Sequence, residues 1–107
     1  MYSDQIVLCG ANSYKQKYYF NQDFAALPQT VKEELQIMCV LFTEDVGGIF
    51  QLVFSETGEL EFRTSCDEND LLYDEIGCGL KIRQLQQTKQ ELLEALQMYY
   101  KVLYVGI

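Results

Sequence analysis

The sequence contains no histidine, and it has a single proline. Histidine is the usual general base near neutral pH, the usual partner of a serine or cysteine nucleophile and the commonest metal ligand. Its absence excludes Ser–His and Cys–His catalytic pairs and leaves acid–base chemistry to carboxylates, thiols, tyrosines and lysines. The composition therefore disfavours an enzyme, and we expect no catalytic residue, no cofactor and no metal site.

The sequence also lacks the cysteine spacing of a zinc site. Its four cysteines are Cys9, Cys39, Cys66 and Cys78, and no two of them form a C-x-x-C pair. No apolar run approaches the roughly 18 residues of a membrane-spanning helix, and no basic-then-apolar segment opens the sequence as a signal peptide would. We therefore expect a cytoplasmic protein without membrane contact, whose thiols are reduced and pack as small hydrophobic side chains.

Basic residues are scarce. Eight Lys and Arg face sixteen Asp and Glu, for a net charge of −8. The imbalance is concentrated between Glu44 and Glu75, where ten acids stand against one base, Arg63. Phosphate backbones and anionic lipid surfaces repel such a chain, so the charge disfavours direct binding to nucleic acid or to membranes.

The length and the turn-forming residues predict one domain over residues 1–107. A chain of 107 residues can bury about two thirds of its unfolded surface in one modest core. Gln5 to Cys9 predicts a short strand that ends at Gly10. The segment from Ser13 to Phe20 stays open, because Ser13 and Gln16 match a helix capping box whereas its aromatic end suits a strand.

A helix is predicted from Pro28 to the Gly47-Gly48 pair. Proline suits the start of a helix and glycine suits its end. The continuous apolar run Ile37–Phe42 indicates a helix that is buried nearly all round by its end. One face is formed by apolar residues spaced three and four apart, namely Val31, Leu35, Met38 and Phe42.

The clearest local pattern is a β-hairpin over Ile49–Phe54 and Glu59–Thr64. Apolar residues alternate along both strands, and the loop between them places Gly58 where a left-handed conformation is usually needed. The expected buried side chains are Phe50, Phe54, Leu60 and Phe62, and the expected exposed ones are Glu59, Glu61 and Arg63. A lone hairpin is marginally stable, so we expect it to gain a third strand and to pack on a helix.

The chain after Asn69 is helical in character. We predict a short helix, a break at Gly77-Cys78-Gly79, and a long helix from Leu80 to Tyr104 with Gly106 as its C-terminal stop. The long helix carries an apolar seam that contains Ile82, Leu85, Lys89, Leu92, Leu96, Tyr99 and Leu103. The sequence thus predicts an α+β fold with an N-terminal strand, a helix, an antiparallel β-hairpin and a long C-terminal helix packed on the sheet.

Two features suggest chemistry, and each has a simpler explanation. The acidic cluster Asp67–Glu75 offers carboxylates to a divalent cation, but it lacks the glycine and glutamate positions of an EF-hand loop, and acids also gather at helix starts. Cys78 lies between two glycines, where backbone N–H groups could activate a thiol, but it is equally suited to packing at a tight corner.

Three segments resemble a family of short bacterial proteins of unknown function. They are CGANSYKQKYYF (Cys9–Phe20), ELQIMCVLFTEDVGG (Glu34–Gly48) and LLYDEIG (Leu71–Gly77). The resemblance covers nearly the whole chain and implies a free-standing domain in a bacterial cytoplasm. It implies no activity, ligand or catalytic residue.

Together these features predict a non-enzymatic protein-interaction or regulatory module. We expect a homodimer, because the long apolar seam exceeds what one hairpin face covers, with Tyr99, Tyr100 and Leu103 as the interface candidates. Two alternatives stay open. One is a small enzyme or thiol protein that uses Cys78 or the acidic cluster Asp67–Glu75, and the other is an acidic mimic of nucleic acid that binds a basic partner.

Overall fold

The computed structural model describes residues 6–105, which form one antiparallel sheet and three helices in the order ββαββαα. The elements are β1 (Ile6–Asn12), β2 (Lys17–Phe20), α1 (Gln29–Val46), β3 (Ile49–Phe54), β4 (Leu60–Ser65), α2 (Glu75–Thr88) and α3 (Gln90–Tyr100). A 3-10 turn, Gln22–Phe24, follows β2, and a π-helical segment, Lys101–Val105, continues α3. Among these residues, no helix has both the length and the apolar character needed to cross a membrane.

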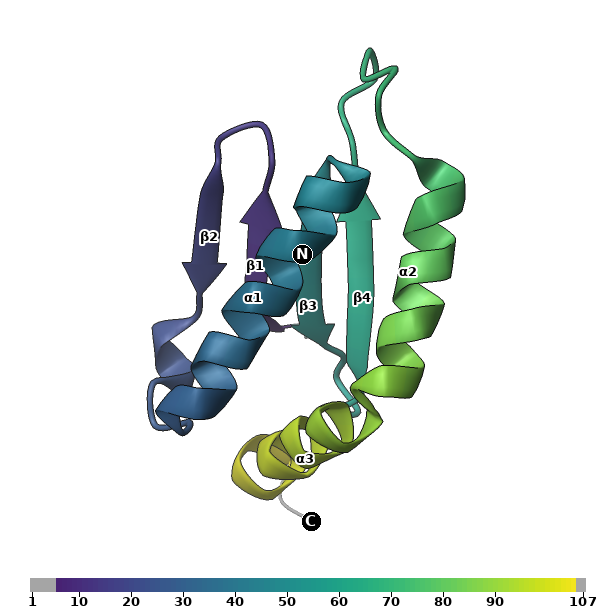
Figure 1. The fold of residues 1–107 in the computed structure, drawn as a ribbon. Helices are drawn as coiled ribbons and strands as arrows, with labels where there is room; N and C mark the ends of the chain where they lie inside the picture. The colour runs from purple at the N-terminus through teal and green to yellow at the C-terminus, as the bar shows by residue number, and fades with distance from the viewer. Residues whose placement is uncertain (1–5, 106–107) are drawn as a thin grey trace.

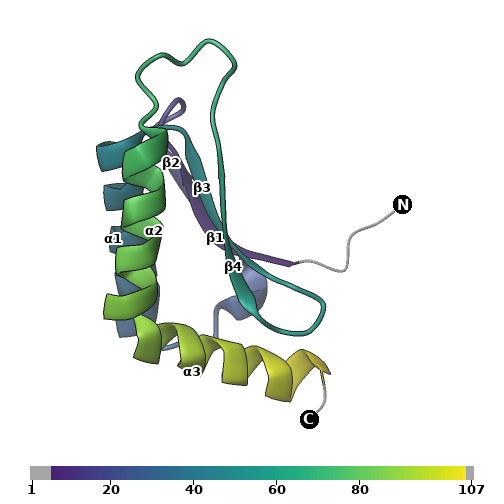
Figure 2. The same ribbon diagram turned by 90° about the vertical axis from the view of Figure 1, so that its right-hand side faces the viewer.

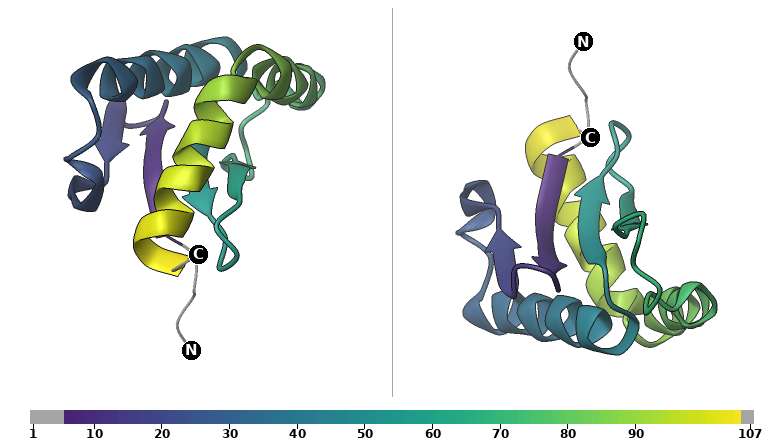
Figure 3. Two further views of the ribbon diagram at one scale, coloured as in Figure 1. Left: turned by 90° about the horizontal axis from the view of Figure 1, so that it is seen from below. Right: turned by 90° about the horizontal axis from the view of Figure 1, so that it is seen from above.

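The sheet has the strand order β2-β1-β3-β4, and the helices lie against one of its faces (Figure 1). Figure 2 shows α1 and α2 side by side on that face, while α3 turns away from α2 and crosses the lower end of the sheet. The views along the sheet in Figure 3 show the same crossing. The predicted α+β class, with a C-terminal helix in contact with the strands, is confirmed.

The core lies between α1 and the inward face of the sheet. Phe42 of α1 stacks on Phe50 of β3 with ring centroids 4.1 Å apart, and both side chains are buried. Leu35, Cys39 and Leu52 around them are fully buried. Because each buried aliphatic or aromatic side chain contributes roughly 1.5–3 kcal/mol, this layer supplies most of the stability of the α1–sheet contact.

A second aromatic cluster fastens α3 to the sheet. Tyr100 stacks on Phe54 at 4.3 Å between centroids, and Phe24 lies 5.6 Å from Phe54. Tyr104, just beyond α3, stacks on Tyr100 at 5.0 Å. All of these distances lie within or near the range in which aromatic pairs attract one another. The lower end of the sheet is therefore closed by rings from four separate segments.

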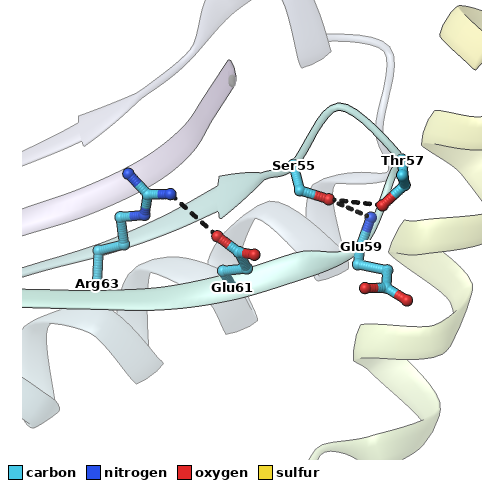
Figure 4. A network of polar contacts seen from close by, with 5 residues as sticks. All are labelled: Ser55, Thr57, Glu59, Glu61 and Arg63. Atoms are coloured by element: carbon cyan, nitrogen blue, oxygen red, sulfur yellow. Dashed lines mark hydrogen bonds and ion pairs between the residues drawn. The ribbon is translucent and has the colours of Figure 1, made fainter. Parts of the chain in front are cut away.

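The β3–β4 hairpin confirms the predicted register. Phe54 pairs with Leu60 and Leu52 with Phe62, so the alternating apolar residues share the inward face. Glu61 and Arg63 form an ion pair at 3.0 Å on the exposed face of β4, and Ser55 closes the turn by bonding Thr57 and the N–H of Glu59 (Figure 4). Gly58 has φ +88°, the left-handed conformation expected there.

The N-terminal half contributes two strands instead of one. β1 runs from Ile6 to Asn12, past the predicted end at Gly10, and pairs with β3 as the expected third strand; Gln5 lies outside the described residues. The open segment resolves into a turn at residues 13–16 and the strand Lys17–Phe20. The aromatic content thus outweighs the capping-box pattern, because Tyr18 and Phe20 can pack on the core from β2.

Helix α1 begins after Pro28 and ends at Gly47, as the sequence predicts. The expectation that Ile37–Phe42 is buried all round is wrong, because Ile37 is 58% and Leu41 50% exposed. The helix lies on the sheet as an outer layer, so only the side turned toward the strands is covered. Its inward residues Leu35, Met38 and Phe42 are buried as expected.

The predicted break at Gly77-Cys78-Gly79 is also wrong. α2 runs through these residues, because the carboxylate of Asp74 caps the helix by accepting a hydrogen bond from the Gly77 N–H at 2.8 Å. A Cβ at position 77 would lie 2.2 Å from an Asp74 carboxylate oxygen. Glycine at this position makes room for the cap and does not mark the end of a helix.

The helical chain breaks at Lys89 instead, between α2 and α3. Lys89 has φ −110° and ψ 20°, and its ammonium pairs with Glu34 of α1 at 2.9 Å. No glycine or proline signals this corner. The corner is explained by packing, because the change of direction at Lys89 allows Leu96 and Tyr100 of α3 to pack in the core. The proposed stop at Gly106 lies outside the described residues.

Candidate functional site

A groove of about 490 Å³ lies between α1 and α2. Met38 and Phe42 of α1 and Leu85 of α2 line it, and the first two are also core residues. Ile37 and Leu41 stand at its edge with half or more of their surface in solvent. Clefts lined mainly by apolar side chains are the usual places where ligands or partner segments bind.

Two ion pairs bridge the groove. Lys81 of α2 pairs with Asp45 of α1, and Lys89 pairs with Glu34 at 2.9 Å. Exposed pairs of this kind contribute only about 0–1 kcal/mol each, so they are not what holds the helices on the sheet. They do fix the spacing of the helices, and they neutralise both lysines that line the groove.

The loop of residues 66–74 is anchored by the β1–β2 turn. The Tyr14 hydroxyl donates a hydrogen bond to the Asp70 carboxylate and accepts one from the Asp67 N–H at 3.0 Å. The hydrogen bond to Asp70 raises the pKa of Tyr14, which keeps the hydroxyl protonated and donating. The far end of the loop is fixed by Asp74, whose N–H donates to the Val46 carbonyl at 3.2 Å.

This anchored loop presents leucines to solvent. Leu71 is 95% and Leu72 92% exposed. On the adjoining α2, Ile76 and Leu80 are 79% and 61% exposed, and their spacing of four places them on one face of the helix. We call five of these exposed side chains the helical apolar surface. Ile37 and Leu41 of α1 line the groove, whereas Leu72, Ile76 and Leu80 lie on the loop and on α2 outside its lining.

Two of the five acids in the cluster Asp67–Glu75 have structural contacts. Asp74 caps α2, and Asp70 binds Tyr14 and the N–H of Leu72. Within residues 6–105, no group of three or more His, Cys, Asp and Glu is arranged to hold a metal ion. The hydrogen bonds support the helix-start explanation for Asp74.

Cys78 is a packing residue in this fold. Its side chain is 6% exposed, and its sulfur accepts a hydrogen bond from the Tyr73 hydroxyl at 3.2 Å. Burial and that hydrogen bond raise the pKa of Tyr73, so a phenolate is not at hand to act as a base for the thiol. The arrangement gives a substrate no direct access to the sulfur.

Cys66 is the exposed thiol, and we predict that it alone reacts with a neutral alkylating agent while the protein stays folded. Partial desolvation and the nearby carboxylates of Asp70, Glu75 and Asp67 raise its pKa. Less thiolate is present at pH 7, so its rate should fall below that of a model peptide cysteine. Intact mass should show one adduct in buffer and four in denaturant, and Cys66→Ser should remove the first. Rapid modification of Cys78 would contradict this assignment.

Two further thiols meet in the core. The sulfur atoms of Cys9 and Cys39 lie 3.7 Å apart, and both residues are fully buried. The hydrogen bond with Cys9 and burial raise the pKa of Cys39, and burial raises that of Tyr18 nearby. The Tyr18 hydroxyl finds no partner among the described residues. Neutral, buried groups of this kind are not nucleophiles, and they bind β1 and β2 to α1.

The three interface candidates have different surroundings. Tyr100 is 4% exposed inside the aromatic cluster, so it belongs to the core of one chain and not to an exposed patch. Tyr99 is half-buried, and Leu103 is 57% exposed. Leu103 adjoins two other exposed apolar side chains, Val102 and Tyr104. Sequence reasoning missed the helical apolar surface, although the unpaired leucines Leu71 and Leu72 within an acidic segment were a visible signal.

Comparison with known proteins identifies a family. A protein-family model described as a family of unknown function (DUF6145) matches residues 5–107. No curated protein and no solved structure matches the chain. The family match agrees with the resemblance of the three segments to an uncharacterised family.

Proposed function

The chain belongs to this family of unknown function, and we propose that it is a protein-interaction module that binds a partner through the helical apolar surface. The observation that carries the proposal is the exposure of five large aliphatic side chains, between 50% and 92%, on the neighbouring helices α1 and α2 and on the loop before α2. Two of them, Ile37 and Leu41, line the groove. Isolated exposed apolar residues are common on proteins, but contiguous apolar patches mark binding sites.

The anchoring of the loop strengthens the proposal. Leu71 and Leu72 are exposed to solvent and so contribute little to the free energy of folding. Even so, the segment that carries them is held in place by contacts with Tyr14 and Val46. A surface ordered before binding loses less conformational entropy when a partner docks. The contacts therefore suit a preorganised binding surface.

The proposal also includes a homodimer and a location in the bacterial cytoplasm. Val102, Leu103 and Tyr104 form a separate exposed patch that a second copy could cover, and light scattering that gives a mass near twice 12.4 kDa would support a homodimer. A mass near 12.4 kDa at micromolar concentration would exclude it.

The free thiols of Cys9, Cys39, Cys66 and Cys78 favour the reducing cytoplasm, and the segment resemblance favours a bacterial one.

The binding claim is tested by comparing two variants with the wild-type chain in affinity capture from the native cell. Ile37→Ser/Leu41→Ser removes the apolar edge of the groove, and Tyr19→Ser is the matched control because Tyr19 is 55% exposed on β2, away from the helices. Substitutions at exposed sites should each change the free energy of unfolding by about 0.5 kcal/mol or less, so both variants should fold.

We expect one protein to be captured by the wild type and by Tyr19→Ser, and to be reduced about tenfold or more with Ile37→Ser/Leu41→Ser. Capture that is the same with all three chains would refute the proposal. So would the absence of any protein that the wild type retains above a blank resin.

A further inference from the structure

Resting on the proposed function, we infer that the occupant of the helical apolar surface is a basic amphipathic helix. The surface lies along two neighbouring helices, and α2 alone is about 21 Å long at ~1.5 Å per residue. An apolar stripe on a third helix can pack on the exposed face of α2, because side chains at spacings of three and four fit between its ridges. Ile76 and Leu80 of that face and Leu72 of the adjoining loop lie within the acidic segment 66–80, so the inference concerns this part of the helical apolar surface.

The charge around the surface selects a basic partner. Between Cys66 and Leu80 the chain has five acids and no lysine or arginine. The two lysines that line the groove are already paired with Asp45 and Glu34. The leucines of the loop thus belong to a segment whose charges are all negative, which repels acidic segments and attracts lysine and arginine. A second copy of this chain, with net charge −8, is a poor occupant for the same reason.

Three carboxylates are free to receive those cations. The side chains of Asp67, Glu68 and Glu75 make no hydrogen bond or ion pair with other residues in the described range 6–105, whereas Asp70 and Asp74 are engaged in holding the loop and capping α2. Glu68 and Glu75 are exposed, as is Asp67. Neutralising these three should therefore weaken binding without releasing the loop.

The probe is a pair of synthetic helical peptides of about 18 residues, which span ~27 Å as a helix. Both carry leucines at spacings of three and four; one has lysines on the polar face and the other glutamates. Binding is measured by fluorescence anisotropy with the full chain. The apolar variant is Ile76→Ser/Leu80→Ser, and the acidic variant is Asp67→Asn/Glu68→Gln/Glu75→Gln. The matched control, Glu56→Gln/Glu59→Gln/Glu91→Gln, makes the same change in net charge, from −8 to −5, at exposed acids elsewhere.

We expect the lysine peptide to bind about tenfold or more tightly than the glutamate peptide. The apolar variant should weaken its binding about tenfold, the acidic variant about fivefold, and the control less than about twofold. Equal binding of both peptides, failure of the lysine peptide to bind, or equal effects of the two charge variants would overturn the basic-helix inference. Those results leave the capture experiment with Ile37→Ser/Leu41→Ser untouched, so the two proposals fail separately.

Discussion

Phe54→Ala is expected to lower the free energy of unfolding by about 3–5 kcal/mol, a large part of the total for a domain of this size. The Phe54 side chain is fully buried, and its ring contacts both Tyr100 at 4.3 Å and Phe24 at 5.6 Å. Its removal leaves a cavity where three segments meet, so the loss includes the aromatic contacts as well as the transfer of the ring. Chemical denaturation followed by circular dichroism measures the effect.

The control for this change is Tyr19→Ala, which removes an aromatic ring from an exposed position on β2. It should cost less than about 1 kcal/mol, because it opens no cavity. Hydrogen exchange should show that Phe54→Ala loosens α3 more than α1, since Phe54 joins α3 to the sheet through Tyr100. Equal destabilisation by the two substitutions would show that the aromatic cluster does not fasten α3.

The hairpin could be predicted from sequence because its information is local. Alternation of Leu60 and Phe62 with the charged residues Glu59, Glu61 and Arg63 fixes the inward face, and a one-residue slip would expose both apolar side chains. Gly58 marks the turn for the same kind of reason, since its φ of +88° favours glycine. Register and turn depend on residues within a short stretch, and both were found.

The helix break depends on distant residues and could not be predicted in this way. Gly77 and Gly79 are residues that often end helices, but here the Asp74 carboxylate caps the start of α2 by accepting a hydrogen bond from the Gly77 N–H. Lys89 has no breaking tendency of its own, and its corner follows from the packing of Tyr100 on Phe54. A polar residue within an otherwise apolar seam was the one sequence signal at Lys89, and it is compatible with an unbroken helix.

The candidate site was missed for a related reason. A run such as Ile37–Phe42 shows that a helix has apolar residues on several sides, but it does not show how many layers cover them. Here one sheet covers the inward side, and α2 leaves Ile37 and Leu41 at the edge of a groove. Tyr100 shows the converse, because an aromatic residue near the end of the chain suggested an interface and instead fills the core.

Gly48→Ala is expected to cost about 3 kcal/mol or more and to release the loop of residues 66–74. Gly48 has φ +70°, a left-handed conformation that costs other residues roughly 1–2 kcal/mol. In addition, a Cβ there would lie 2.5 Å from the Ser65 carbonyl oxygen and 2.7 Å from the Tyr73 ring. Both neighbours must move, and Tyr73 is the residue that seats the loop beside the turn between α1 and β3.

Gly47→Ala separates conformational strain from this contact. Gly47 also has a positive φ, +87°, but a Cβ there would meet nothing within 4 Å, so only the backbone cost of about 1–3 kcal/mol applies. Hydrogen exchange of residues 66–74 should rise in Gly48→Ala and stay near the wild-type rate in Gly47→Ala. Binding of the lysine peptide should fall only in Gly48→Ala, because the loop that presents Leu72 and the acidic side chains would no longer be held. Equal exchange in the two variants would mean that Tyr73 does not anchor the loop, whose order would then depend on the contacts of Tyr14, Val46 and Asp74.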